Sequence, residues 1–519
     1  MGSHKFMILL FVPSFMITLS AVFGYNLGVT RPWCAQTPHP ETCQFYLGHD
    51  PRSIPIRGRS QFRNMLLQLA LSNAKNGWTN TYSLGSRYQS GKGKAAWADC
   101  VKLYEYTVDR LNSTANPNVR SGADDSQTWL STALTNIETC KAGFVEMGVS
   151  DNTLPLLSNN VSALISNTLA LNDPSSYSPP RTTNGFPTWV RSGDRKLLQS
   201  SSPASNANVV VAQDGSGDYM TINESLAAVP KRPGNSRYII YIKAGTYDEH
   251  VEIGSKLKNI MFVGDGIGQT IITGNRSNGG GYTTYNSATV AAVGDGFIAR
   301  DITFQNTAGA VNHQAVALRS GSDLSVFYRC SFEGYQDTLY AHSDRQFYRE
   351  CDIYGTVDFI FGNAAVVFQN CNIYARYPPN KVNTVTAQGR TDPNQNTGIS
   401  IHDCNITAAP DLAPVQDSVK TYLGRPWKLY SRTVVMETYL DSLINAAGWL
   451  EWSGTFALDT LYYGEYMNTG PGSATDNRVT WAGYHVMNSS ADASNFTVGS
   501  FIAGDSWLPA TGVPYTSGL

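Results

Sequence analysis

Charged side chains are scarce in this chain of 519 residues, at only 15% of the total. Three catalytic patterns are also missing: there is no G-x-S-x-G nucleophile turn, no H-E-x-x-H motif, and no cluster of Cys and His at zinc-binding spacing. These absences disfavour a serine hydrolase and a zinc enzyme. Gly, Asn, Ser and Thr are abundant instead, which is typical of turn-rich β structure in a secreted protein.

The net charge of −2 conceals an uneven distribution. Residues 1–198 carry 18 Lys+Arg and 12 Asp+Glu, whereas residues 199–519 carry 20 and 28. The first part is basic, at +6, and the second is acidic, at −8, which argues against nucleic acid as the partner of the second part. Because 519 residues exceed what one hydrophobic core usually serves, we expect two domains.

The N-terminus has the pattern of a leader. Residues 6–24 are apolar, follow Lys5 and end in small side chains, as in a secretory signal peptide. Their length also permits an uncleaved membrane anchor. The eight Cys fall in two groups of four, one on each side of the change in charge. This arrangement indicates an oxidising compartment and two separate disulfide sets.

Residues 25–172 show helical periodicity. Apolar residues recur every three or four positions in 61–72, 95–111 and 128–145, so we expect about four antiparallel helices in an all-α bundle. The segment has no carboxylate–His or metal-spaced cluster, and we interpret it as an inhibitory or chaperone-like pro-domain. A structural domain that only aids folding is the alternative.

Residues 173–206 are rich in Pro, Ser, Gly and Thr and read as an exposed linker. The linker contains the sequence RKLL at 195–198. A dibasic step in an exposed linker is a suitable protease site, so we predict cleavage after Leu198.

Beyond the linker, residues 207–519 change to short β runs such as VVVAQ, YIIYIKAGTY and NIMFVGDG, separated by Gly and Asn. Runs of this kind without intervening helices predict a solenoid in which each coil buries its apolar face on the next. Residues 217–230 are expected to form a short helix that covers the first open edge.

A spacing of 21 residues ties two acids together. Cys330 and Cys351 are 21 apart, and so are Asp337 and Asp358. A repeat of this length predicts a parallel β-helix with coils ~4.8 Å apart, which places the two aspartates side by side on an outer face. Two carboxylates this close rarely both ionise fully, so one pKa of the pair should rise and the pair can divide acid and nucleophile roles.

The cysteine frame recurs at two later positions, so adjacent coils can carry thiols close enough to bridge. The four residues for which we expect disulfides in this half are Cys330, Cys351, Cys371 and Cys404.

The sequences GYQDTLY (334–340) and GTVDFIFG (355–362) resemble the two central motifs of plant pectin methylesterases. These are carbohydrate esterases that remove methyl groups from homogalacturonan. The resemblance extends from Asn208 to the C-terminus. It implies an all-β, right-handed parallel β-helix and hydrolysis of pectin methyl esters to methanol and free galacturonate, with neither metal nor other cofactor.

The resemblance also implies a role for each motif residue. Asp358 is the nucleophile that forms an acyl-enzyme, and Asp337 is the acid for methanol and then the base for water. Gln314, in NHQAVALR, and Gln336 donate to the oxyanion. Arg425, in YLGRPW, pairs with Asp358 and keeps it ionised and oriented.

Sugar rings need apolar platforms, and four aromatic residues lie beside these motifs. The candidates for substrate subsites are Tyr340, Phe361, Trp427 and Trp449. Trp427 is the preferred one because it follows Arg425 by two residues and can share its face.

Three pieces of the helical region resemble the pectin methylesterase and invertase inhibitor family: 34–43, 95–111 and 129–144. This likeness implies disulfides joining Cys34 to Cys43 and Cys100 to Cys140. In plant enzymes with such a pro-region, a motif similar to RKLL marks processing by subtilisin-like proteases.

The expected partners are methyl-esterified pectin, a subtilisin-like protease and inhibitor proteins of the pro-domain type. The mature enzyme is expected to be a monomer secreted to the cell wall. Seven N-x-S/T sequons permit glycosylation, at Asn112, Asn160, Asn223, Asn275, Asn405, Asn488 and Asn495.

Two alternatives remain at this stage. Pectin-chain hydrolases also use parallel β-helices, and paired carboxylates ~5 Å apart can serve a retaining glycosidase. The helical region alone would fit a non-enzymatic inhibitor, although the intact second half opposes this for the whole chain.

Overall fold

The computed structural model describes residues 30–49, 56–88, 91–119, 121–149, 160–172, 182–183, 186–187, 206–231 and 236–519. The leader expected at 1–24 and the RKLL site at 195–198 lie outside these ranges. Within the ranges, every helix is too short or too polar to cross a membrane.

The chain divides into two compact units. One contains residues 1–84, 101–141 and 151–176, and the other contains 85–100, 142–150 and 177–519. The helices of the N-terminal region are α2 (Pro40–His49), α3 (Arg59–Ser83), α4 (Gly91–Ala115), α5 (Ala123–Glu146) and α7 (Val161–Leu171), with a short turn η1 (Leu84–Ser86). The all-α prediction is therefore confirmed for this region.

Helix α3 continues well beyond the predicted 61–72 because small residues take over its buried face. Ala74, Gly77 and Thr81 are buried in its second half, and an apolar count overlooks them. A Cβ on Gly77 would lie 2.6 Å from the ring of Tyr104, so the close approach requires glycine here. The disulfide Cys34–Cys43 joins the start of α2 to the segment before it.

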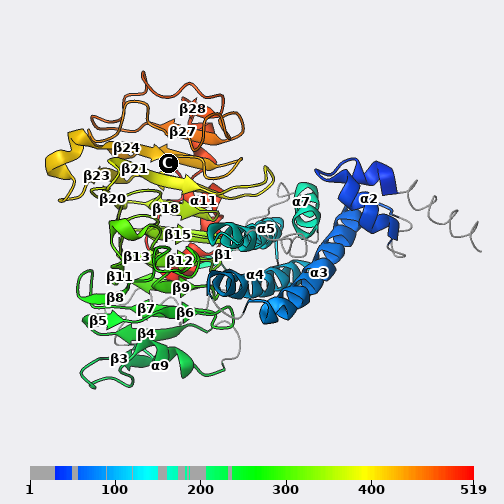
Figure 1. Ribbon diagram of the computed structural model, residues 1–519, viewed down its shortest axis with the longest axis horizontal. Helices are drawn as coiled ribbons and strands as arrows, with labels where there is room; N and C mark the ends of the chain where they lie inside the picture. Colours follow the sequence, from blue (N-terminus) through cyan, green and yellow to red (C-terminus); the bar gives the residue numbers. More distant parts are fainter. Residues whose placement is uncertain are drawn as a thin grey trace, which may run out of the picture. The chain divides into compact units, whose positions relative to one another are not determined.

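The β-helix consists of three parallel sheets, and Figure 1 shows their strands stacked in chain order. The first sheet contains β3 (Val209–Val211), β4 (Tyr238–Ile242), β7 (Ile260–Val263), β10 (Ile298–Arg300), β13 (Ser325–Tyr328), β16 (Arg345–Arg349), β19 (Ala365–Gln369), β22 (Gly398–His402), β25 (Arg432–Met436), β27 (Tyr462–Tyr466) and β28 (Tyr484–Val486). The second contains β5 (Gly245–Asp248), β8 (Thr270–Gly274), β11 (Thr303–Asn306), β14 (Ser331–Glu333), β17 (Asp352–Gly355), β20 (Asn372–Ala375), β23 (Asn405–Ala408) and β26 (Tyr439–Leu440). The third contains β6 (Val251–Ile253), β9 (Val290–Ala292), β12 (Leu318–Ser320), β15 (Leu339–Ala341), β18 (Ile360–Gly362), β21 (Val382–Gln388) and β24 (Lys420–Gly424).

Short elements complete the described chain. They are the antiparallel pair β1 (Thr182–Thr183) and β2 (Phe186–Pro187), the helices α9 (Ile222–Ala227), α10 (Ser490–Ser494) and α11 (Val498–Phe501), and the turns η4 (Ala310–Asn312), η5 (Ala413–Ser418), η6 (Gly504–Ser506) and η7 (Leu508–Thr511).

Helix α9 lies where the sequence places the capping helix. Thr221 and Glu224 form a reciprocal capping box at its start, which satisfies two backbone donors. Ile222 and Leu226 are buried in the same apolar cluster as the first strands of the β-helix. The helix therefore covers the inside of the first coil, beside β3.

From β10 onward, each corner between the first and second sheets uses one non-glycine residue in the left-handed conformation. Their φ angles lie between 50° and 59°, and the residues are Asp301, Arg329, Glu350, Asn370, Asp403 and Glu437. The repeated conformation gives successive coils the same bend. At these six corners the conformation is adopted by Asp, Asn, Arg and Glu, whereas glycines adopt positive φ at the earlier corner between β7 and β8.

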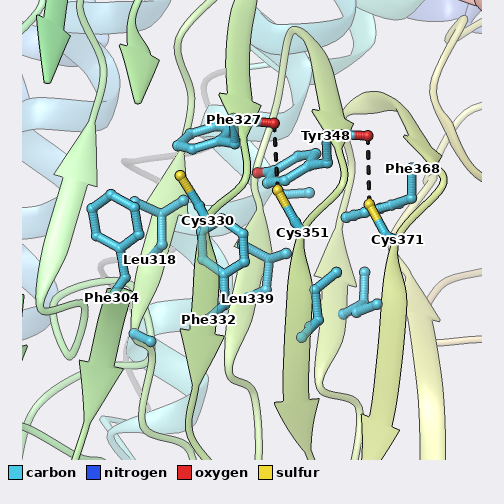
Figure 2. Packing of buried hydrophobic residues seen from close by; sticks show 14 of the residues in the cluster. Phe304, Leu318, Phe327, Cys330, Phe332, Leu339, Tyr348, Cys351, Phe368 and Cys371 are labelled. Carbon is cyan, nitrogen blue, oxygen red and sulfur yellow. Dashed lines mark hydrogen bonds between the residues drawn. The ribbon is translucent and has the colours of Figure 1, made fainter. Parts of the chain in front are cut away.

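The disulfides expected in the β-helix are absent: Cys330, Cys351, Cys371 and Cys404 are free and buried in the core. Their thiols lie among stacked aromatic rings and donate to backbone carbonyls, Cys351 to Phe327 and Cys371 to Tyr348 (Figure 2). In an in-register parallel ladder the Cβ atoms keep the ~4.8 Å strand spacing. That spacing exceeds the ~3.8 Å a disulfide prefers, which explains why adjacent thiols do not bridge.

The remaining cysteines follow the prediction more closely. Cys100 and Cys140 are both disulfide-bonded, in addition to the Cys34–Cys43 pair.

Candidate active site

The strand register places the two aspartates on neighbouring rungs. Leu339 of β15 pairs with Ile360 of β18, and Ile360 pairs with Thr386 of β21. Two residues before each of these stand Asp337, Asp358 and Thr384, so the three occupy one column across adjacent coils. Coils in a parallel sheet lie ~4.8 Å apart, which is the juxtaposition that the 21-residue spacing predicts.

Both aspartates sit in tight turns between the second and third sheets. Their φ angles are +62° for Asp337 and +52° for Asp358, a conformation that Asp tolerates better than most residues. Gly355 begins the second motif at a close approach, since a Cβ there would lie 2.2 Å from the Cβ of Phe359. The motif therefore needs its glycine to make the turn.

Burial of the two aspartates differs from the sequence expectation. Asp337 is 7% exposed and Asp358 is 5% exposed, so neither stands open on an outer face. A charge on either one therefore needs a partner.

Asp358 has that partner. The Arg425 Nε donates to Asp358 Oδ1 at 2.8 Å, and Nη2 donates to Oδ2 at 2.7 Å. Arg425 follows β24 directly, and its backbone N–H donates to Thr386 O, which fixes its position on the third sheet. The bidentate geometry matches a guanidinium to an ionised carboxylate.

Asp337 lies in a different environment. On its other side the register places the buried Val316, and no hydrogen bond to its carboxyl group occurs within the described residues. Burial raises the pKa of Asp337 well above its usual range, and the neighbouring Asp358 carboxylate raises it further. Asp337 is therefore suited to hold a proton.

Backbone hydrogen bonds hold the chain at Gln314 and Gln336, the two glutamines predicted to donate to the oxyanion. The backbone N–H of Ala315 donates to Gln336 O, and the N–H of Asn278 donates to Gln314 O. Both glutamine side chains are partly exposed, and within the described residues their amides make no hydrogen bond. They remain available as donors to a bound substrate.

Three of the four predicted aromatic platforms form a contiguous group. Tyr340 and Phe361 stack with centroids 4.1 Å apart, and Phe361 meets Trp427 edge-on at 6.0 Å. These residues belong to β15, β18 and the segment after β24, next to the turns that carry Asp337 and Asp358.

The fourth candidate, Trp449, is a core residue. It is 1% exposed, stacks on Tyr463 at 4.2 Å, and donates its indole N–H to Glu465. The exposed aromatic is Trp452, whose ring lies 4.4 Å from the Arg425 guanidinium carbon. The sequence places both tryptophans in one short run, and only the packing decides which of them faces the site.

Thr384 is a further residue that the sequence analysis missed. Its hydroxyl donates to Asp358 Oδ1 at 2.6 Å and accepts the Asp358 backbone N–H at 2.9 Å. Counting a further coil along the same column would have found it, but the interval from Asp358 to Thr384 is longer than the repeat that precedes it.

No group of three or more His, Cys, Asp or Glu side chains among the described residues is arranged to hold a metal ion.

Known proteins resemble both regions of the chain. The pectinesterase family profile matches residues 208–505, and the plant invertase/pectin methylesterase inhibitor profile matches residues 29–171. The chain is 65% identical to pectinesterase 2 of Citrus sinensis, over 96% of each chain. It is 59% identical to probable pectinesterase/pectinesterase inhibitor 17 of Arabidopsis thaliana, over 100% of each.

Solved structures give the same result for the β-helix. Pectin methylesterase from carrot is 64% identical, with a TM-score of 0.60, and covers 60% of this chain and 98% of its own. Pectin methylesterase from Aspergillus niger, in deglycosylated form, is 29% identical, with a TM-score of 0.50, and covers 64% of this chain and 97% of its own.

Proposed function

The chain belongs to the pectinesterase family and hydrolyses methyl esters of pectin, and we propose that Asp358 is its nucleophile and Asp337 its acid and base. The observation that carries this assignment is the unequal environment of the two acids. Asp358 is paired with Arg425, whereas Asp337 is buried without a cation of its own and has a raised pKa. One therefore attacks as a carboxylate while the other donates a proton.

The reaction proceeds in two halves. Asp358 attacks the C6 carbonyl carbon of a methylated galacturonate and forms an acyl-enzyme anhydride, while the bond to methoxide breaks and Asp337 gives its proton to the departing methanol. Asp337, now ionised, takes a proton from water, which attacks the anhydride carbonyl and releases free galacturonate and the Asp358 carboxylate. Both acids return to their starting states.

Negative charge on the former carbonyl oxygen needs donors in each half. We assign these donors to the amides of Gln314 and Gln336, which are partly exposed, and removing one such donor typically costs about 10²–10³ in rate. Trp427 and the exposed Trp452 supply apolar surface for the sugar chain beside the ester, whereas Tyr340 and Phe361, each 3% exposed, stack on one another and support Trp427 through its edge-on contact with Phe361.

The test is methanol release by Asp358→Asn and Asp337→Asn, with Asp352→Asn as the matched control. Asp352 lies on β17 of the same coil as Asp358 and bonds Asn372, away from both acids. We expect turnover to fall by more than about 10³-fold in the first two variants and to persist in the third. Near-wild-type release by Asp358→Asn would refute the assignment. New reducing ends, measured in parallel, would reveal cleavage of the chain instead of the ester.

We further propose that the helical region acts as an inhibitory pro-segment. Residues 142–150 belong to the same compact unit as the β-helix. The Glu146 carboxylate accepts hydrogen bonds from Asn278 Nδ2 and Thr284 N at 2.8 Å and from Thr284 Oγ1 at 2.6 Å. Charge on Glu146 also contributes to the raised pKa of Asp337, which supports its closeness to the catalytic acids.

Release from this contact would follow cleavage after Leu198 by a subtilisin-like protease, leaving a monomeric enzyme secreted to the cell wall. The exposed position of all seven sequons is compatible with glycosylation on that route. Comparing methanol release before and after cleavage tests the proposal, and we expect the full chain to be slower. Equal rates would contradict it, as would an extracellular form that begins upstream of Arg195.

A further inference from the structure

Thr384 makes four hydrogen bonds to the turn that carries Asp358. Its backbone N–H donates to Thr356 O at 3.2 Å, and its carbonyl accepts from Phe359 N at 3.4 Å. Its hydroxyl accepts from Asp358 N at 2.9 Å and donates to Asp358 Oδ1 at 2.6 Å. Thr384 is 1% exposed, so water cannot replace these bonds.

The two oxygens of Asp358 are consequently unequal. Oδ1 accepts from both Thr384 Oγ1 and Arg425 Nε, which occupies its two lone pairs. Within the described residues, Oδ2 accepts from Arg425 Nη2 alone and keeps one lone pair free. The oxygen with the free lone pair is the one able to form a new bond to carbon.

We propose that Thr384 is a positioning residue that fixes the Asp358 carboxylate so that Oδ2 is the attacking atom. The inference rests on the proposed role of Asp358 as nucleophile. Without the hydroxyl, Oδ1 keeps only its bond from Arg425 Nε, so each carboxylate oxygen then has one donor and the two ends are no longer distinguished by their number of hydrogen bonds. A nucleophile held less closely to its attack geometry reacts more slowly although the substrate still binds.

The column position explains why threonine is suitable. Thr384 continues the line of Asp337 and Asp358 by one coil and lies next to Tyr422 of β24. A third carboxylate here would repel Asp358, and a valine would give it no donor. A small hydroxyl side chain can accept the turn N–H and donate to the carboxylate at the same time.

The experiment compares Thr384→Val with Thr384→Ser, and uses Thr270→Val as the control. Thr270 matches Thr384 closely because it is buried, accepts Asp265 N and donates to Ile242 O, but lies on β8 at a distance from the site. We expect kcat for methanol release to fall ~10- to 100-fold in Thr384→Val with KM within about twofold. Thr384→Ser should recover most of kcat, and Thr270→Val should lower only the melting temperature.

A kcat within twofold of wild type in folded Thr384→Val would overturn the inference, and so would an equal loss of kcat in Thr270→Val. If Thr384→Val does not fold, Thr384→Ala with the same kinetic readout replaces it. The Asp358→Asn variant distinguishes a failure of the nucleophile assignment from a failure of the role proposed for Thr384. An active Asp358→Asn removes the nucleophile assignment itself, whereas an inactive one beside an unaffected Thr384→Val removes only the role of Thr384.

Discussion

Replacing Arg425 by lysine tests the electrostatic basis of the site. The guanidinium makes two charge-assisted hydrogen bonds to Asp358, at 2.8 and 2.7 Å, and a lysine ammonium keeps the charge but loses the fork. One hydrogen bond to a charged group contributes about 1.5–3 kcal/mol, and each 1.36 kcal/mol is a tenfold change in rate. Arg425→Lys should therefore lower kcat/KM roughly 10- to 160-fold, and Arg425→Ala by more.

The control is Arg329→Lys. Arg329 makes the same forked contact to Asp301, at 2.8 and 2.9 Å, on a corner between the first and second sheets. Its replacement changes a similar pair without touching the catalytic turns, so methanol release should stay within twofold of wild type. If Arg425→Lys is as active as wild type while Asp358→Asn is inactive, then the two hydrogen bonds from the guanidinium do not orient the proposed nucleophile. If Arg329→Lys shows the same loss, the effect comes from the coil as a whole.

Three other predictions follow from the corrected features. Asp337 keeps its proton to higher pH when folded, so it favours the folded state at low pH and this contribution is lost as pH rises through its raised pKa. The melting temperature of Asp337→Asn relative to wild type should accordingly increase from pH 4 to pH 8, and a constant difference would contradict the burial argument. Thiol titration of the denatured, unreduced protein should find four free thiols, because the β-helix cysteines do not bridge; fewer than four would mean that a bridge forms. Trp452→Ala should weaken catalysis about fivefold through the lost cation–π contact with Arg425, whereas Trp449→Phe should lower stability and leave KM unchanged.

The mistaken predictions share a cause. The spacing of the cysteines correctly placed them on adjacent coils, but it gave no information on the direction of their Cβ bonds. Those bonds are parallel in an in-register ladder, so the thiols stay too far apart to join. The same limit applied to Trp449 and Trp452, which lie three residues apart and point into different surroundings. Side-chain direction in irregular segments depends on packing that no local pattern records.

The sequence alone predicted that the two aspartates are neighbours, because the repeat length sets the register between successive coils. A 21-residue interval returns the chain to the same position one coil later, so Asp337 and Asp358 had to be neighbours once the coils formed. The different roles that we propose for them depend on contacts from outside that repeat. Arg425 reaches Asp358 from 67 residues away, Thr384 from a longer coil, and Val316 from the coil before. Only the stacking of complete coils brings these side chains to opposite ends of the pair, which is why the tertiary structure decides the different surroundings of the two aspartates on which their proposed roles depend.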